Sequence, residues 1–149
     1  MMDKSNSIFG FQGQYRFLSN FWMTPVVINA WIFPSSEHAY QASKSEDPSD
    51  WRMIQALPTP GQTKRAGRRV NLRPDWEDIK LKCMVQIVWA KFKNSDLRQK
   101  LVLTGNKELV EANNWNDRFW GTDMNGNGQN VLGKILMQVR EEVIANANS

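Results

Sequence analysis

The feature that most constrains the fold is a segment from Asp75 to about Lys93 whose apolar residues recur at helical spacing. The apolar positions are Trp76, Ile79, Cys83, Ile87 and Ala90, widened by Met84, Val88 and Phe92. This repeat predicts an amphipathic helix, the longest in the chain. Because one neighbour cannot cover so wide a stripe, we expect this helix to be buried on more than one side and to lie at the centre of the fold.

A short β-hairpin is predicted before it. Val26-Val27-Ile28 and Trp31-Ile32-Phe33 are runs of β-branched and aromatic residues, and they flank Asn29-Ala30, which can form a tight turn. Pro34 is expected to end the second strand.

Other segments also read as helices, separated by turn signals. The predicted helices run from a cap at Ser35 or Ser36 to about Ser45, from Ser49 to Leu57, from Thr59-Pro60 through about Arg69, from a cap at Ser95 to Thr104-Gly105, and from Val131 to Ile144. Leu109 to Ala112 is predicted to be a short strand or extended segment, and Asn113 to Asn130 a long polar loop. The sequence therefore predicts a mainly helical α+β fold.

Length and composition are those of one globular domain. The chain has 149 residues, of which 41% are hydrophobic and 23% charged. No apolar stretch approaches a membrane span, so we expect no membrane partner. Cys83 is the only cysteine, which excludes an intrachain disulfide and favours a reducing, cytoplasmic location.

A local cluster contributes much of the net charge of +4. The clustered residues are Lys64, Arg65, Arg68, Arg69 and Arg73. On a helix, Lys64 would align with Arg68 and Arg65 with Arg69. Such rows are either a solvated face or a patch that contacts phosphates.

Several kinds of chemistry are excluded by residue counts and spacing. One His and one Cys cannot supply a zinc cage, and no P-loop or dinucleotide fingerprint is present. Asp123 to Gly128 imitates the start of a calcium loop, but the twelfth position is Lys134, where the motif requires Glu. We therefore expect no metal and no cofactor.

The stretch from Ser35 to Lys44 carries the strongest indication of a site. Glu37, Gln41 and Lys44 are four and three residues apart, so they share one face of the predicted helix. An acid, an amide and an amine on one face can protonate, orient and attack a bound substrate. Such a row of polar residues is also common on a solvated surface.

Together with motifs elsewhere, this stretch resembles the NADAR family, also called YbiA-like N-glycosidases. The motifs are Phe17-Leu18-Ser19-Asn20-Phe21, Ser36-Glu37-His38-Ala39-Tyr40-Gln41 with Lys44, Lys91-Phe92, Leu109-Val110-Glu111-Ala112, Asp117-Arg118-Phe119-Trp120-Gly121 and Asn130 to Arg140. The match runs from about Phe9 to Arg140. It implies a single NADAR-like domain over residues 1–149, with its core at about residues 8–144.

The resemblance implies hydrolysis of N-glycosidic bonds. Some members of the family remove ADP-ribose from guanine bases in DNA, and others are linked to ribosylamino-pyrimidine intermediates of riboflavin biosynthesis. The expected partner is accordingly an ADP-ribosylated nucleic acid or a phosphorylated ribosylamino compound.

Breaking a C–N glycosidic bond calls for a carboxylate near the sugar and a proton donor at the base. Glu37 is the first candidate, because a first helical turn favours its ionised form. Lys44 can act electrostatically, bind phosphate, or attack the opened sugar to form a Schiff base if its pKa is lowered.

Asp117 is the second candidate carboxylate. Beside it, Arg118 can clamp a phosphate, Trp120 can stack on the base or ribose, and Gly121 permits close approach of the backbone. Alternatively, the loop is stabilised by hydrogen bonds between Asp117 and its own backbone.

The remaining substrate-binding candidates are Ser19, Asn20, Tyr40 and Asn130. Ser19 and Asn20 are expected to follow an extended segment and to bind sugar hydroxyls or cap a turn. Asn130 stands at the start of the final helix, where a capping role is favoured. His38 is expected to be a hydrogen-bonded structural residue.

Two other functions use the same residues. A non-catalytic module that binds ADP-ribose or NAD-like ligands needs the aromatic and basic side chains, but it does not call for two carboxylates. The second alternative function is that of a simple basic DNA-binding protein, but no helix-turn-helix, zinc-finger or RNA-binding signature supports it.

Overall fold

The structure is a computed structural model that describes residues 6–148. Its contacts divide the chain into two compact units, one formed by the residues up to Ser19 and from Asn94 onward, the other by Asn20–Lys93. Helices dominate and the strands form two small sheets in the described residues, which confirms the α+β class. The single domain expected over residues 1–149 stays a prediction, and residues 1–5 and 149 lie outside the described part.

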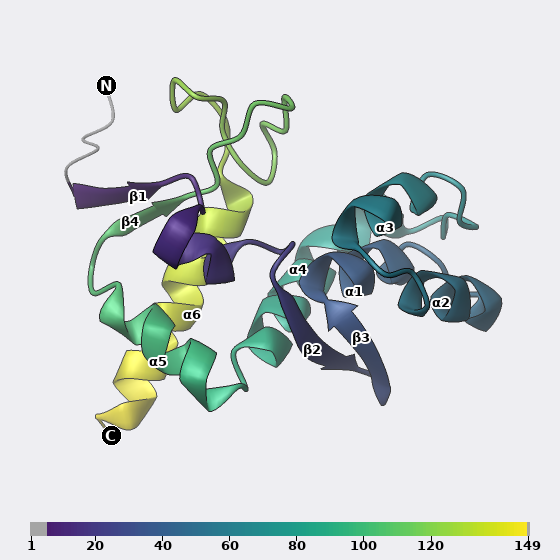
Figure 1. The fold of residues 1–149 in the computed structure, drawn as a ribbon, viewed down its shortest axis with the longest axis horizontal. Helices are drawn as coiled ribbons and strands as arrows, with labels where there is room; N and C mark the ends of the chain where they lie inside the picture. Colours follow the sequence, from purple (N-terminus) through teal and green to yellow (C-terminus); the bar gives the residue numbers. More distant parts are fainter. Residues whose placement is uncertain (1–5, 149) are drawn as a thin grey trace. The chain divides into compact units, whose positions relative to one another are not determined.

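The unit Asn20–Lys93 is built around one short helix (Figure 1). Its elements are β2 (Met23–Ile28), β3 (Trp31–Ser35), α1 (Ser36–Ser43), α2 (Pro48–Gln55), α3 (Pro60–Ala66) and α4 (Trp76–Lys91). Helix α1 packs against all five of the others. Within this unit the central helix is therefore α1, and the expectation that α4 would hold this place is wrong.

Strands β2 and β3 form the predicted hairpin. They pair antiparallel from Ile28 opposite Trp31 to Met23 opposite Ser35. Asn29 and Ala30 have φ angles of 50° and 67°, as a two-residue type I′ turn requires. Pro34 does not end β3, because the outer edge of a two-stranded sheet makes no ladder bonds and tolerates a residue without an N–H.

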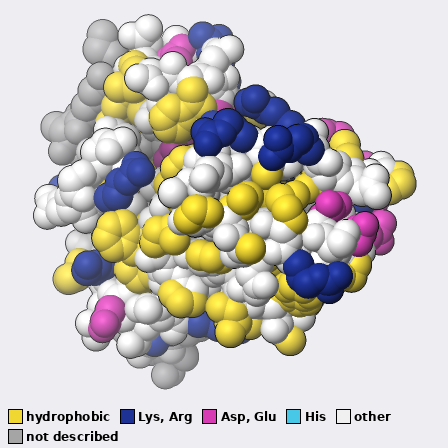
Figure 2. Space-filling model, turned by 45° about the vertical axis from the view of Figure 1, so that its right-hand side comes forward, with side chains coloured by type: hydrophobic (Ala, Val, Ile, Leu, Met, Phe, Trp, Pro, Cys, Tyr) yellow, Lys and Arg dark blue, Asp and Glu magenta, His cyan; other side chains and the backbone are white. Residues whose placement is uncertain are grey.

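Apolar side chains of the hairpin also reach solvent. Val27 is 52% and Ile32 57% exposed. Figure 2 shows a face of the molecule on which hydrophobic side chains lie open between groups of Lys and Arg.

Helix α1 begins where the sequence predicted, at a serine cap. The Ser35 hydroxyl accepts a hydrogen bond from the His38 N–H at 3.2 Å, which satisfies one of the free donors of the first turn. The helix ends at Ser43, two residues earlier than expected.

Helix α3 has a capping box at its start, formed by Thr59 and Gln62. It ends at Ala66 with Gly67 as its C-cap, so the prediction of a helix through Arg69 is wrong. Arg68 and Arg69 follow in a turn, and the helical rows expected for the basic cluster do not form. Helix α2 likewise ends at Gln55 instead of Leu57.

The wide apolar stripe of α4 faces two different environments, the core and a cavity. Met84, Ile87 and Val88 are each 1% exposed and belong to the core. Ile79 and Cys83 instead line a cavity within the same unit. The helix has 16 residues, against 17 for α6, so it is not the longest.

The other unit contains two short strands that lie far apart in the sequence. Its elements are β1 (Ser7–Phe9), a 3₁₀ helix (Gly13–Leu18), α5 (Ser95–Leu103), β4 (Glu108–Val110) and α6 (Val131–Ala147). Strand β1 pairs in parallel with β4, and α6 packs against β4 and α5 (Figure 1). Leu101, Leu109, Leu136 and Val139 are almost completely buried in its core.

Three expectations for this unit need correction. Ser19 follows a 3₁₀ helix and not an extended segment. Asn94 caps α5 through a hydrogen bond from the Leu97 N–H, where Ser95 was expected. Helix α6 continues to Ala147, three residues beyond the predicted end.

The polar segment 113–130 is a loop, as predicted, with one isolated bridge between Ala112 and Thr122. Among the described residues, no helix is long and apolar enough to cross a membrane.

Candidate functional site

The predicted site residues divide between the two units. Asn20, Glu37, Tyr40 and Lys44 belong to the unit Asn20–Lys93, whereas Ser19, Asp117, Arg118, Trp120, Gly121 and Asn130 belong to the other.

Glu37 lies in the first turn of α1 and is only 7% exposed. Its backbone N–H donates to the Asn20 carbonyl at 3.0 Å. Its Oε1 accepts a hydrogen bond from Gln41 Nε2 at 2.8 Å. The predicted face of α1 therefore forms, and Gln41 holds the carboxylate in a fixed orientation.

Close packing against the turn after α3 holds Gln41 itself. A Cβ atom added at Gly67 would overlap the side-chain amide of Gln41. Gln41 Oε1 is buried and has no hydrogen-bond partner among the described residues. Sequence reasoning missed Gly67, although a glycine placed directly after a predicted helix is the kind of signal that can mark such a close approach.

Lys44 follows Glu37 and Gln41 on the same face, at the C-cap of α1. Burial lowers the pKa of its amine, Glu37 opposes this effect, and the positive charges of Arg68 and Lys80 lower the pKa further. The net direction is downward, so a larger fraction of this lysine is neutral near neutral pH than for an exposed lysine. Sequence reasoning did not single out Lys80, because its place beside Lys44 depends on the packing of α4 against α1.

Tyr40 and Asn20 help to hold this face in place. The Tyr40 ring packs against Trp76 with 5.4 Å between centroids, and Lys44 Nζ lies 5.5 Å from the centre of the Tyr40 ring. Asn20 Nδ2 donates to Met84 Sδ at 3.5 Å. These contacts connect α1 to α4.

His38 is fully buried. Its Nδ1 pairs with Ser35 Oγ at 2.6 Å and its Nε2 with the Leu57 carbonyl oxygen at 2.8 Å. Both ring nitrogens thus have hydrogen-bond partners, as expected for a structural residue.

In the other unit, Asp117 organises its own loop. Its Oδ1 accepts hydrogen bonds from the N–H groups of Phe119 at 3.1 Å and Trp120 at 3.0 Å. Asn113 closes the loop by accepting from the Asp117 N–H and donating to the Asp117 carbonyl. Asp117 Oδ1 therefore stabilises the loop through hydrogen bonds to its own backbone, as in the second alternative that the sequence left open.

The neighbours of Asp117 make further local contacts. Arg118 pairs with Asp123 at 3.1 Å and its side chain is 59% exposed. Trp120 packs edge-on against Phe119, with 4.7 Å between centroids. Gly121 permits a close backbone approach, because an added Cβ would overlap the Glu111 carbonyl oxygen.

Ser19 and Asn130 are both 6% exposed. Asn130 is the N-cap of α6 by position, but its side chain makes no capping bond. Instead, its Oδ1 accepts from the Glu111 N–H and its Nδ2 donates to the Leu109 carbonyl. The capping role favoured for Asn130 is therefore replaced by a link from α6 to β4.

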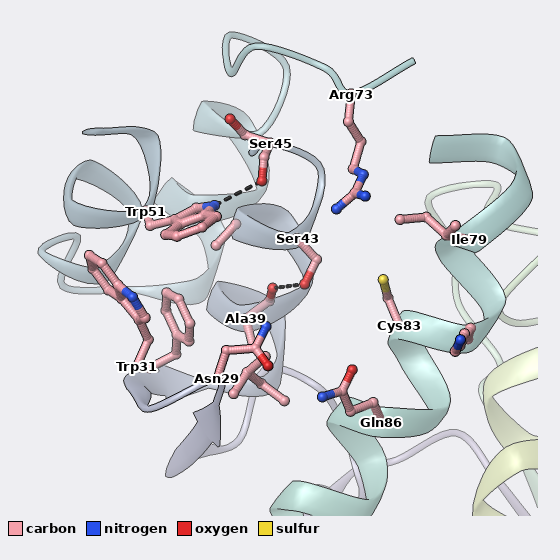
Figure 3. A pocket seen from close by; sticks show the side chains of 14 residues that line it. Asn29, Trp31, Ala39, Ser43, Ser45, Trp51, Arg73, Ile79, Cys83 and Gln86 are labelled. Atoms are coloured by element: carbon pink, nitrogen blue, oxygen red, sulfur yellow. Dashed lines mark hydrogen bonds between the residues drawn. The ribbon is translucent and has the colours of Figure 1, made fainter. Parts of the chain in front are cut away.

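No cluster of three or more His, Cys, Asp or Glu side chains that suits a metal ion occurs within residues 6–148. A cavity of about 350 Å³ does occur in the unit Asn20–Lys93. Ala39, Ala42 and Ser43 line it from α1 (Figure 3). Since these positions lie opposite Glu37, Gln41 and Lys44 on a helix, the cavity and the polar row occupy different faces of α1.

Several known proteins are similar to this chain in sequence. The N-glycosidase YbiA of Escherichia coli is 34% identical over 146 residues, covering 96% of this chain and 91% of YbiA. An N-glycosidase of Nostoc punctiforme is 39% identical over 135 residues, covering 87% of this chain and 86% of that protein. A riboflavin biosynthesis protein of Vibrio vulnificus is 39% identical over 132 residues and 87% of this chain, which spans only 36% of the Vibrio protein.

The fold agrees with this relationship. The NMR structure of Escherichia coli YbiA superimposes with a TM-score of 0.84 and 32% identity, covering 96% of this chain and 86% of that structure. The named relatives confirm the expected enzyme class, an N-glycosidase. A sequence model described as the NADAR domain matches residues 8–144, and the chain therefore belongs to the NADAR family.

Proposed function

We propose that this N-glycosidase removes ADP-ribose from modified guanine in DNA, with Glu37 and Lys44 carrying the chemistry. The observation that carries the proposal is the pairing on one face of α1 of a buried, oriented carboxylate with an amine whose pKa is lowered. Binding alone requires neither a fixed carboxylate nor a lysine that is easily deprotonated.

Hydrolysis breaks the bond between the anomeric carbon and the base nitrogen. The electron pair leaves with the base, which takes up a proton, and positive charge develops on the sugar. Ionised Glu37 stabilises this charge and accepts a proton from the attacking water. Water then supplies the new hydroxyl on the anomeric carbon, so ADP-ribose and the free base are the products.

Lys44 offers a covalent version of the same reaction. Its neutral amine adds to the anomeric carbon of the ring-opened sugar, and the base leaves with the electron pair and a proton. The resulting Schiff base joins Lys44 to the sugar, and water hydrolyses it to restore the amine. Lowering the pKa of Lys44 raises the fraction of amine that can attack at neutral pH.

The charges around Lys44 support a phosphate-bearing substrate. Arg68 and Lys80 both act on Lys44 electrostatically, and such cations suit the pyrophosphate of ADP-ribose. Arg118 and Trp120 belong to the other unit, and the contacts predicted for them, to a phosphate and to a base or ribose, stay predictions.

A ribosylamino-pyrimidine phosphate is the second candidate substrate. The 39% identity to a riboflavin biosynthesis protein favours it. Such a compound has the same type of C–N bond and one phosphate, so Glu37 and Lys44 would do the same chemistry.

A single-turnover assay separates the two substrates. The purified protein is mixed in excess, without added metal, with a DNA oligonucleotide that carries ADP-ribosylated guanine, and separately with a ribosylamino-pyrimidine phosphate. Faster release of ADP-ribose supports the proposal. Turnover of the ribosylamino-pyrimidine phosphate alone would favour the second candidate substrate. Turnover of neither compound would contradict both proposed substrates.

Borohydride trapping tests the role of Lys44. We expect a reduced adduct of protein and sugar with the parent chain, and none with Lys44→Arg, which keeps the charge but cannot form the Schiff base. Lys93→Arg is the matched control at an exposed lysine. An active parent that gives no adduct would leave Lys44 with an electrostatic role only.

A further inference from the structure

The cavity in the unit Asn20–Lys93 has the features of a second ligand site. It is walled by the hairpin, α1, Trp51 of α2 and one side of α4 (Figure 3). Its volume of about 350 Å³ lies within the range of small-molecule sites. We propose that it binds an uncharged, planar heteroaromatic ring with a carbonyl edge, of the nucleobase class.

Aromatic side chains form one wall of the cavity. Trp31 and Trp51 meet edge to face with 5.4 Å between centroids, and Trp31 also stacks on Phe33 at 6.3 Å. Trp51 Nε1 donates to the Ser45 carbonyl oxygen at 2.8 Å, which fixes its ring. A wall of ordered aromatic rings favours a flat ligand, because ring stacking adds to the burial of apolar area.

Polar groups approach from the other sides. Figure 3 shows the Arg73 guanidinium, the Gln86 amide and the Cys83 sulfur directed toward the space between the walls. Arg73 uses Nε and Nη2 to bind Asp75, which leaves the two N–H groups of Nη1 without an acceptor among the described residues. Gln86 adds an amide that both donates and accepts.

The charge balance favours an uncharged ligand. Arg73 is paired with Asp75 at 2.7 Å and lies 3.9 Å from Glu46, and Lys82 lines the cavity. Asp75 and Glu46 thus offset the charge of Arg73, although neither lines the cavity, and Lys82 is exposed, so solvent screens its charge and the attraction for an anion is weak. The N–H groups of Arg73 Nη1 suit a neutral carbonyl oxygen, and the Gln86 amide suits the adjacent ring N–H, a combination that lactam edges of nucleobases present.

This site is separate from the glycosidase residues. It uses Ala39, Ala42 and Ser43 of α1, on the side away from Glu37. The proposal therefore holds whether or not the proposed ADP-ribosyl substrate is correct, and its test does not measure turnover.

Cys83 reports directly on the cavity, because it lines it and is the only cysteine in the chain. Burial raises the pKa of its thiol, so modification by a disulfide reagent is measured at about pH 9, where enough thiolate forms. Hypoxanthine is the probe. We expect saturating hypoxanthine to slow the modification at least tenfold, whereas inorganic phosphate and indole do not.

Variants show where the probe binds. Gln86→Ala, at an exposed helix position, should remove most of the protection, and Leu81→Ala, an exposed α4 residue outside the cavity, should keep it. Ala42→Leu narrows the cavity from α1 and should also abolish protection, with thermal unfolding as the check of folding.

Three results would overturn the proposal. The first is an unchanged modification rate at saturating hypoxanthine. The second is equal protection by indole or phosphate, which would show that the class of ligand is wrong. The third is loss of protection in Glu37→Gln with retention in Gln86→Ala, which would place the probe on the opposite face of α1.

Discussion

Glu37 and Asp117 are the two carboxylates that the sequence singled out, and their surroundings differ. Glu37 is 7% exposed and accepts a side-chain hydrogen bond from Gln41. Asp117 is partly exposed and uses Oδ1 to accept two backbone N–H groups of its own loop. The Glu37 carboxylate is held by a side chain of its own helix, whereas the Asp117 carboxylate accepts hydrogen bonds from the backbone of a turn.

The difference shows how similar sequence signals arise from different causes. A carboxylate that accepts adjacent backbone N–H groups stabilises a turn wherever it occurs. A carboxylate buried beside a lysine whose pKa is lowered carries an energetic cost that folding alone does not explain. This difference supports the proposal that Glu37 and Lys44 carry the chemistry, and we expect Asp117 to position Trp120 and its neighbours.

The largest effect is expected for Glu37→Gln. The amide oxygen can still accept from Gln41 Nε2, so the fold should persist, but the negative charge is lost. Single-turnover glycosidase rates should fall by about 10³-fold, with little change in the unfolding temperature. Glu142→Gln, at an exposed position of α6, is the matched control. A rate within tenfold of the parent would remove Glu37 from the chemistry.

Gly67→Ala tests whether the orientation of Glu37 matters as well as its charge. The new methyl group would overlap the Gln41 amide, so Gln41 must move and release Glu37. We expect a loss of about 1–3 kcal/mol in unfolding free energy and a fall in rate beyond that of Gly105→Ala. Gly105 has open space around it but a φ of 69°, so this control measures backbone strain alone. Equal rates for the two variants would contradict the orienting role of Gln41.

Asp117 is best examined with two substitutions. Asp117→Asn keeps an oxygen for the Phe119 and Trp120 N–H groups, so activity should remain within about threefold. Asp117→Ala removes the acceptor and should cost about 1 kcal/mol of stability, measured by denaturant unfolding. A large loss of activity in Asp117→Asn with unchanged stability would show instead that the charge acts in catalysis.

The smallest effect is a change in pH dependence. Arg68→Gln removes a positive charge that disfavours protonated Lys44, so the pKa of Lys44 should rise. If neutral Lys44 attacks, the alkaline rise in single-turnover rate moves to higher pH. Arg52→Gln, at an exposed position of α2, serves as control. A profile identical to that of the parent would argue against neutral Lys44 as the reacting form.

Local signals predicted much of the fold. The cap at Ser35, the hairpin around Asn29-Ala30, the end of α5 and the long loop were all readable, because each depends on a few neighbouring residues. Element ends were less accurate: Gly67 ended α3 early, and Pro34 was accepted inside an edge strand.

Features that depend on distant contacts could not be read. The parallel pairing of β1 with β4 joins segments about a hundred residues apart, each only three residues long. In the site, the row of polar residues on α1 could be predicted from residue spacing. The positions of Lys80 and Gly67 beside this row could not, because they depend on how other segments pack against α1. The sequence did not reveal the cavity, because its residues come from the hairpin, three helices and the segments between them.

The same β1–β4 pairing bears on how the chain folds during synthesis. Residues Asn20–Lys93 form a unit continuous in sequence, whereas the other unit needs both its first 19 residues and those from Asn94 onward. On the ribosome, the continuous unit has all its residues first and can fold first, while β1 waits for β4 to emerge. A nascent chain stalled before Glu108 therefore exposes an unpaired strand, so this is the interval in which we expect the protein to need chaperones most.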